Sequence, residues 1–379
     1  MSTTVPATAP NLGVRVLSLD GGGIGTLSEL LILDRMMYRI QTELRRDAKP
    51  SPCEYFELIG GSGTGGIVAL MLGRLRMSID EAISAYEKLR PQSNSESRKR
   101  TVEGSRPDAC KTFVCAMNAV NMNGGRPELF RSYDTMDEPA IDCMLWEAAR
   151  ATSATPGLFK AVEIGLGAMK QRYVGGGVGH NNPTSRVLAE AEDIYPSSPV
   201  VFVASIGSGH SATIHIPNSS NPRDIAKAMK DITMDCEETH EANATRFRGL
   251  PDTYFRFNVQ QGMQGLASHD WEKSNEVSAH TRNYLTAQDV KEKLSGAVKV
   301  ILNPVIRVSA YSKICPAPSV RFTGRGGILE KMTEYFNRDI GRRHIFLLHG
   351  LGGSGKSQVA FKFVEQSESW LVGTWSHHN

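Results

Sequence analysis

The sequence has no run of about 18 apolar residues, the length that a membrane-spanning helix needs. Residues 1–11 lack the basic-then-apolar pattern of a secretory signal peptide. The six cysteines are scattered and contain no C-x-x-C pair, which is typical of a chain kept in a reducing compartment. We therefore expect a cytoplasmic protein for which any membrane contact would be peripheral.

An excess of one charge sign is also missing. The 43 basic and 40 acidic residues leave a formal net charge of +3, too small to indicate a nucleic-acid partner. No internal repeat and no low-complexity tract is found. With 379 residues, 22% of them charged, the chain can bury a large core, and its length predicts roughly two domains.

What the sequence does contain is an alternation of short apolar segments, glycine turns and helical periodicity. Residues 14–19 (VRVLSL) predict a strand that ends at a glycine turn, after which apolar residues recur at helical spacing over 27–40. The same order returns at 56–60 (FELIG), which precedes a glycine turn and an apolar stretch over 67–75. Strands that alternate with helices predict an α/β fold with a mainly parallel sheet.

The remaining elements are predicted from composition and periodicity. Ser78 and Glu81 form a capping box, which predicts a helix that begins there and continues through Leu89. Other expected elements are a polar loop over 92–105, a helix over 145–151, a buried strand over 200–206, helical segments over 224–247 and 328–336, and a strand over 345–348.

Three glycine-rich turns stand out in order: DGGGIGT at 20–26, GGSGTGG at 60–66 and GGGVGHNNP at 175–183. Glycines let a backbone approach a substrate closely, and the N–H groups of a glycine loop can bind the oxyanion formed in acyl transfer. A serine on a sharp strand-to-helix turn, beside a base, supplies the nucleophile of such a site.

Together with LWEAARATSATPGLF at 145–159 and SIGSG at 205–209, these turns resemble the patatin-like phospholipases over about 14–306. That family has an oxyanion loop D-G-G-G-x-R-G, a nucleophile elbow G-x-S-x-G and a D-G-[GA] motif whose aspartate completes a Ser-Asp dyad. The resemblance implies a three-layer α/β/α sandwich with a mainly parallel central sheet for residues 12–315. It further implies a site without a cofactor, and phospholipid or lysophospholipid acyl chains as partners.

The residues that would carry out this chemistry are missing. Gly63 stands at the nucleophile position and Gly175 at the position of the dyad aspartate. In the oxyanion loop, Gly25 stands where the family has arginine and Thr26 where it has glycine. Because loss of the nucleophile alone costs a serine hydrolase on the order of a millionfold in turnover, we expect a catalytically impaired domain.

Other residues at the three turns have weaker roles. The oxyanion loop keeps its glycines Gly21, Gly22 and Gly23. Ser62 lies one residue before the elbow apex and is a weak alternative nucleophile, because a one-residue shift on a tight turn redirects the side chain. His180 is interpreted as a polar turn residue and not as a substitute base, and residues 181–183 as shaping the turn into the next helix.

A second motif, GLGGSGKS at 350–357, satisfies the phosphate-loop pattern G-x-x-x-x-G-K-[ST] and follows the expected strand. The expected nucleotide-binding residues are Gly350, Gly353, Gly355, Lys356 and Ser357. Backbone N–H groups would hold the phosphates of ATP or GTP, Lys356 would reach the β- and γ-phosphates, and Ser357 would bind Mg²⁺. With FTGR at 322–325, the segment 316–379 resembles the start of an NB-ARC or NACHT module of NOD-like receptors. Only 358–379 follow the loop, so we expect a linker and a truncated P-loop βα unit.

The order of the two motifs resembles that of fungal NOD-like-receptor proteins. The leading hypothesis is a pseudoenzyme that acts as the effector or scaffold module of such a receptor and oligomerises in the full-length protein. One alternative is an active lipid acyl hydrolase of lipid metabolism, a phospholipase A or lysophospholipase with a displaced nucleophile. Another is a lipid-binding sensor that holds an acyl chain in a pocket without chemistry.

Overall fold

The computed structural model of the chain describes residues 13–88, 110–123, 125–136, 138–196, 198–210, 212–218, 221–304, 319, 322–336, 346, 348–349 and 355–367. The chain divides into two compact units, Met1–Ile306 and Arg307–Asn379. The division predicted from the sequence is at residue 315. The polar loop expected over 92–105 lies outside the described residues.

The first unit is built on one eight-stranded sheet in the order β5-β6-β3-β2-β1-β7-β8, with β4 paired to β3. Its strands are β1 Val14–Leu19, β2 Leu58–Ser62, β3 Lys111–Asn118, β4 Glu128–Arg131, β5 Val162–Ile164, β6 Gln171–Gly175, β7 Val200–Ile206 and β8 Tyr254–Phe257. Strands β3, β2, β1, β7 and β8 pair in parallel, whereas β4, β5 and β6 pair antiparallel. The predicted α/β fold with a mainly parallel sheet is confirmed.

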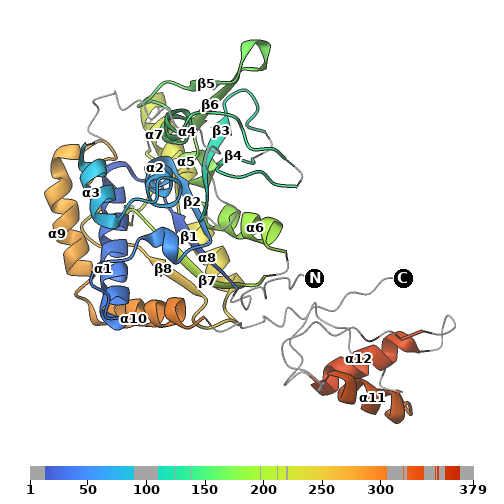
Figure 1. The fold of residues 1–379 in the computed structure, drawn as a ribbon. Helices are drawn as coiled ribbons and strands as arrows, with labels where there is room; N and C mark the ends of the chain where they lie inside the picture. The colour runs from blue at the N-terminus through green and yellow to red at the C-terminus, as the bar shows by residue number, and fades with distance from the viewer. Residues whose placement is uncertain are drawn as a thin grey trace, which may run out of the picture. The chain divides into compact units, whose positions relative to one another are not determined.

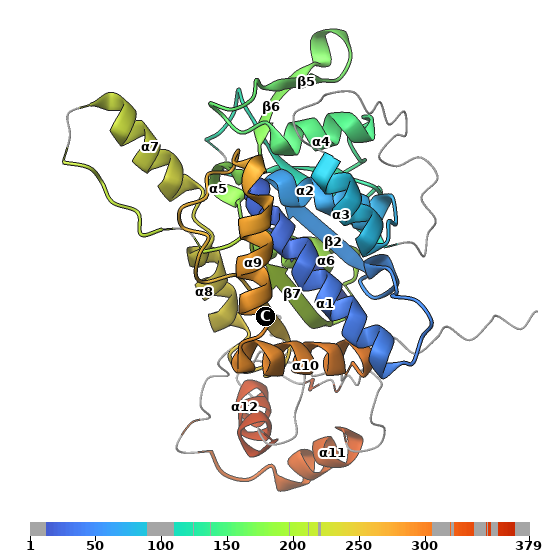
Figure 2. The same cartoon turned by 90° about the vertical axis from the view of Figure 1, so that its left-hand side faces the viewer.

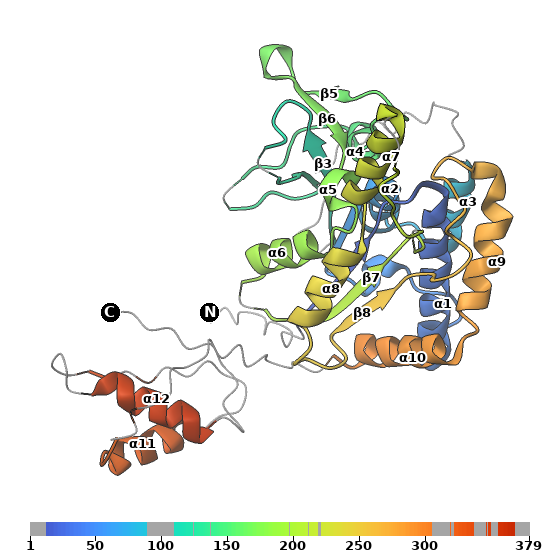
Figure 3. The ribbon, with the colours of Figure 1, turned by 180° about the vertical axis from the view of Figure 1, so that it is seen from behind.

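Helices cover both faces of this sheet. They are α1 Leu27–Glu43, α2 Gly63–Ala69, α3 Ile79–Lys88, α4 Leu145–Ser153, α5 Gly177–His180, α6 Thr184–Ile194, α7 Pro222–Thr233, α8 Glu237–Arg246, α9 Ser274–Tyr284 and α10 Gln288–Leu302. Helices α1, α3, α9 and α10 lie on one side of the sheet (Figures 1 and 2), and α6 and α8 lie on the other (Figure 3). The arrangement is a three-layer α/β/α sandwich.

The alternation of side chains along β1 explains the two layers. Leu17 and Leu19 are buried in the core beneath α1, whereas Val16 is buried with Leu58 in the core beneath α6. Successive residues of a strand point to opposite faces, so a strand covered on both faces is apolar throughout. This is why apolar residues of VRVLSL are buried on both faces of the strand.

Two elements differ from their sequence predictions. Strand β2 begins at Leu58 and continues through Ser62, whereas the prediction was 56–60, because its pairing with β3 extends to Ser62 opposite Cys115. The helical region predicted over 224–247 is two helices, α7 and α8, interrupted at Met234–Cys236. The capping box of α3 is confirmed, since the Ser78 N–H donates to Glu81 Oε2 at 2.8 Å.

The second unit contains α11 Gly326–Phe336 and α12 Lys356–Ser367. Met332 of α11 packs with Val359 and Phe363 of α12 in a small apolar cluster. Of the strand predicted over 345–348, Ile345 and Leu347 lie outside the described residues, and Phe346 and Leu348 are not in a strand. In the parts of the chain that the structure describes, every helix is too short or too polar to cross a membrane.

Candidate functional site

The elbow between β2 and α2 has the backbone that a nucleophile turn requires. Gly63 has φ of +55°, in the left-handed region that favours glycine, and it is half-buried. A Cβ placed on Gly63 would lie 3.2 Å from the Cα of Gly21, so the elbow touches the first glycine turn. The position therefore has the geometry of a nucleophile elbow but no side chain.

Ser62 lies in the strand and not at the apex of the elbow. Its side chain is 0% exposed, and its hydroxyl has no hydrogen-bond partner among the described residues. It shares a face of β2 with Gly60, where a Cβ would meet Phe113 and Val187 of the core beneath α6. Its hydroxyl thus lies inside the protein, away from the position that Gly63 presents.

The backbone N–H groups of the first glycine turn are all used inside the protein. The Gly21 N–H donates to the Asn181 carbonyl at 3.0 Å. Those of Gly22 and Gly23 both donate to Thr64 Oγ1, at 3.2 and 2.9 Å. The expected oxyanion donors are therefore occupied, Gly21 by a backbone carbonyl and Gly22 and Gly23 by a side chain of the neighbouring elbow.

Two departures from the patatin-like pattern bear on this turn. Thr26 Oγ1 lies 2.7 Å from Thr64 Oγ1, so the threonine that replaces a glycine holds the Thr64 hydroxyl in place. A Cβ on Gly25 would overlap the carbonyl oxygen of Ser208. An arginine at residue 25 would therefore need a backbone shift.

The third glycine turn contains the other missing side chain. Gly175 ends β6, and its N–H donates to the Ala154 carbonyl at 2.9 Å. A Cβ on Gly175 would lie 3.0 Å from the Thr152 carbonyl oxygen, a tight but small conflict. The Thr152 carbonyl also accepts from the Gly176 N–H at 3.2 Å. The Thr152 side chain lies against Gly66 of the elbow. The structure thus brings the three glycine turns together.

The polar residues after this turn have structural partners. His180 Nε2 lies 2.7 Å from the Gly125 carbonyl, and burial lowers the pKa of His180. Asn182 Oδ1 accepts from both the N–H and the hydroxyl of Thr184, at 3.1 and 2.6 Å, at the start of α6. Both contacts fit the prediction that His180 is a polar turn residue and that residues 181–183 shape the turn into the next helix.

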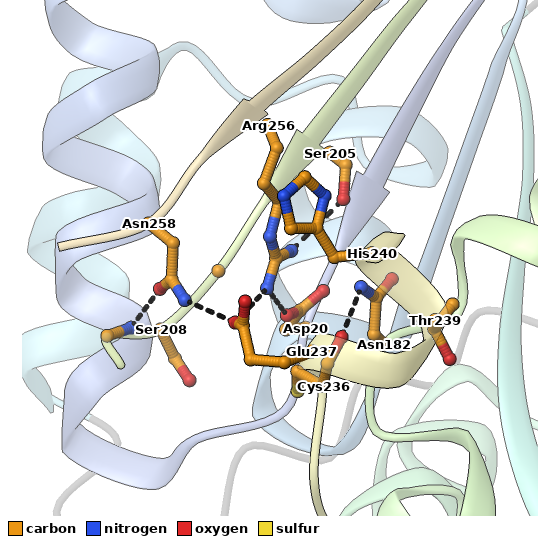
Figure 4. Close-up of polar contacts among 12 residues, drawn as sticks. Asp20, Asn182, Ser205, Ser208, Cys236, Glu237, Thr239, His240, Arg256 and Asn258 are labelled. Carbon is orange, nitrogen blue, oxygen red and sulfur yellow. Dashed lines mark hydrogen bonds and ion pairs between the residues drawn. The ribbon is translucent and has the colours of Figure 1, made fainter. Parts of the chain in front are cut away.

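Behind the glycine turns lies a buried ion pair that connects three strands (Figure 4). Arg256 of β8 donates from Nη2 to Asp20 Oδ2 at 2.7 Å and from Nη1 to Ser205 Oγ at 3.0 Å. Asp20 and Arg256 have side chains 1% and 5% exposed. The Ser205 hydroxyl lies 2.8 Å from that of Thr184, so the network continues to the start of α6.

A second group extends this network toward α8. Asn258 donates to Glu237 Oε1 at 3.1 Å, and Glu237 Oε1 lies 3.8 Å from Arg256 Nη2 (Figure 4). Asn258 also accepts from the Gly209 N–H at 2.8 Å. The cluster thus anchors the segments that follow β7 and β8.

Glu29 of α1 is a buried carboxyl beside this network. It is 0% exposed, and both of its oxygens lack a hydrogen-bond partner among the described residues. Burial raises the pKa of Glu29 well above its ordinary value, the nearby Asp20 charge adds to this rise, and Arg256 opposes it. Glu29 is therefore a neutral acid over a wide range of pH.

This shift predicts how Glu29→Gln changes stability with pH. Because the folded pKa of Glu29 lies above the unfolded one, the wild-type chain loses stability as pH rises from the unfolded pKa to the folded one. Glutamine resembles the neutral acid and does not titrate. We expect similar unfolding free energies below the unfolded pKa of about 4.3, and above it an advantage for Glu29→Gln that grows by up to about 1.4 kcal/mol per pH unit until the folded pKa is reached. Urea unfolding at several pH values measures this difference, and a constant difference would contradict it.

The phosphate-loop residues are described only in part. Gly350 and Gly353 lie outside the described residues. Gly355 has φ of +82°, and α12 begins directly after it at Lys356, with Ser357 in its first turn. These features fit a loop that leads into a helix, as the motif requires. Within the described residues, no three or more His, Cys, Asp or Glu side chains gather as a metal site.

Sequence reasoning missed three residues that shape the site. Thr64, Glu29 and Arg256 carry no motif signal of their own. The single local hint was Thr26 in place of a glycine, since an added hydroxyl in a buried turn needs a partner.

No family model matches the chain. It is 27% identical over 321 residues to calcium-independent phospholipase A2-gamma of Mus musculus, and it spans 39% of the length of that relative, with 74% of the chain covered. It is 28% identical over 271 residues to a protein of Arabidopsis thaliana named probable inactive patatin-like protein 9, covering 58% of the chain and 68% of the relative. Among solved structures, VipD from Legionella pneumophila matches with a TM-score of 0.32 and 12% identity, over 74% of this chain and 67% of that one. The named relatives support a patatin-like domain.

Proposed function

We propose that this chain is a patatin-like domain that no longer hydrolyses lipids and serves as an effector or scaffold module. The observation that carries the proposal is the occupied glycine turn, in which Gly22 and Gly23 donate to Thr64 while Gly63 presents no nucleophile. A site that lacks nucleophile, base and free oxyanion donors keeps the fold and not the chemistry. A relative named probable inactive patatin-like protein 9 fits this view.

Replacing Ser62 by alanine tests this proposal against the active-hydrolase alternative. We expect acyl-ester turnover to be at background before and after Ser62→Ala. Because the buried hydroxyl lacks a partner, its removal should leave the free energy of unfolding unchanged or raise it by about 1 kcal/mol. Initial rates with a chromogenic acyl ester and urea unfolding provide both readouts. Turnover by the wild-type chain that Ser62→Ala abolishes would establish the alternative.

The receptor part of the proposal comes from the second unit. Gly355 with positive φ and a helix that begins at Lys356 support a phosphate loop that binds Mg·ATP or Mg·GTP. The truncated unit would hold the nucleotide without forming a complete switch, and any nucleotide-driven assembly would belong to the full-length receptor. Equilibrium binding of a fluorescent ATP analogue to the full chain, in the presence and absence of Mg²⁺, tests this part.

A lipid sensor remains the second candidate function, because a hollow lies beside the third glycine turn. Its volume is about 400 Å³, and it is lined by Gly179, Ile214 and Ile232 together with the polar residues Thr233, Asp235, Glu238 and Thr239. The two isoleucines would contact an acyl chain and the polar residues a headgroup, beside a site that has no nucleophile to cleave the lipid. Native mass spectrometry of the purified chain, which would show co-purified lipid, distinguishes the sensor from a scaffold that binds none.

A further inference from the structure

Helix α7 presents an apolar stripe at the surface. Ile225, Met229 and Ile232 follow one another at spacings of four and three residues, and their side chains are between 38% and 49% exposed. The rest of the helix surface is polar, with three basic and two acidic residues. Figure 2 shows α7 standing away from the sheet. The helix is therefore amphipathic, and its apolar stripe is about half exposed.

The segment 158–172, which includes β5 and the start of β6, presents a second apolar group. Leu166 and Met169 are 88% and 81% exposed, and Phe159 is also exposed, with the Arg150 guanidinium 5.4 Å from its ring centroid. The segment carries three basic residues and one acidic residue. Exposed apolar side chains that gather on one short segment mark an interaction surface, whereas single ones do not.

Both groups lie at the end of the first unit that carries the candidate site. Figures 1, 2 and 3 are rotations about one vertical axis, and α7 and the β5–β6 segment lie at the upper end of this unit in each. Helix α5, which belongs to the third glycine turn, lies against α7. In Figure 2, helix α7 and the β5–β6 segment are separate projections from this end of the first unit.

We propose that this end of the first unit docks on an anionic lipid surface through α7 and the 158–172 segment. Apolar side chains enter the boundary between headgroups and acyl chains, while lysines and arginines contact anionic headgroups. Two separate projections can touch one planar surface together. The net charge of the whole chain is nearly balanced, so the attraction to anionic headgroups must come from a local excess of positive charge. In the 158–172 segment, Lys160, Lys170 and Arg172 outnumber the single acidic residue, Glu163.

The inference rests on the proposed function, because the surface surrounds the candidate site, but it requires no turnover. The test is cosedimentation of the full chain with vesicles of phosphatidylcholine, alone or with phosphatidylserine. We expect binding that depends on phosphatidylserine and weakens with salt. Ile225→Ser with Met229→Ser, and separately Leu166→Ser with Met169→Ser, should each weaken binding at least about tenfold.

The matched control is Tyr38→Ser with Leu44→Ser, which removes two exposed apolar side chains from α1 and its end and should leave binding unchanged. Lys170→Glu with Arg172→Glu should abolish the preference for phosphatidylserine. The proposal would be overturned by equal binding to both vesicle types or by an equal loss of binding in the control variant. It would also be overturned if the chain does not bind vesicles and instead forms a dimer that the substitutions in either apolar pair dissociate. Hydrolysis of the vesicle lipid would instead contradict catalytic impairment and leave docking intact.

Discussion

Restoring the two missing side chains, by Gly63→Ser with Gly175→Asp, should raise acyl-ester turnover about 10³–10⁴-fold over the wild-type chain. The reacting groups of a serine hydrolase are together worth about a millionfold, and a missing oxyanion donor costs about 10²–10³. Because Gly22 and Gly23 still donate to Thr64, the repaired chain regains the first contribution and lacks the second. Initial rates with a chromogenic acyl ester measure the gain.

The structure has room for both changes. A serine Cβ at residue 63 would lie 3.2 Å from the Gly21 Cα, and its positive φ costs about 1–2 kcal/mol. An aspartate at residue 175 must move slightly from the Thr152 carbonyl oxygen, which lies 3.0 Å from its Cβ. Neither shift is large compared with the stability of a domain.

The single variants provide the control for this prediction. A nucleophile and its base act as a unit, so Gly63→Ser and Gly175→Asp alone should each stay near background. Adding Thr64→Ala to the repaired pair frees the Gly22 and Gly23 N–H groups and should raise turnover further. If Gly63→Ser alone matches the pair, the base does not lie at residue 175. If Thr64→Ala has no effect, the occupied amides do not limit the reaction.

The fold was predictable because its signals are local. The strand at 14–19, its glycine turn and the helix after it each follow from periodicity and composition, and the structure has them as β1 and α1. The end of β2 was not predictable in the same way, since pairing with β3 carries the strand through Ser62. That extension places the Ser62 hydroxyl in the core, which spacing alone could not reveal.

The site was predictable only where glycine marks it. The three turns could be found in the sequence because a backbone that passes close to its neighbours excludes side chains. The partners of those turns could not, because Arg256 and Asp20 are 236 residues apart and meet only when β8 joins the sheet. Thr64 sits in the elbow itself, yet its role depends on where the first turn folds.

Removing the charge of Arg256, by Arg256→Met, should lower the free energy of unfolding by about 3–5 kcal/mol. Asp20 is 1% exposed and has its ion-pair partner in Arg256 at 2.7 Å. Burial raises the pKa of Asp20 even with Arg256 beside it, so without that partner the carboxyl must either keep an unpaired buried charge or take up a proton, and either adds to the cost of the lost attraction. Thermal unfolding followed by tryptophan fluorescence should show a midpoint lower by about 6 °C or more.

Arg246→Met is the matched control, because its partner Glu192 has a side chain 57% exposed and water screens the pair. We expect a loss of at most about 1 kcal/mol there. Adding Asp20→Asn to Arg256→Met removes the stranded charge and should recover part of the loss. An Arg256→Met chain as stable as Arg246→Met would mean that Asp20 is uncharged in the folded protein. The buried pair would then not be what fixes the first glycine turn, and the stability of that turn would come from its other contacts, which include those with Thr64, Asn181 and Ser208.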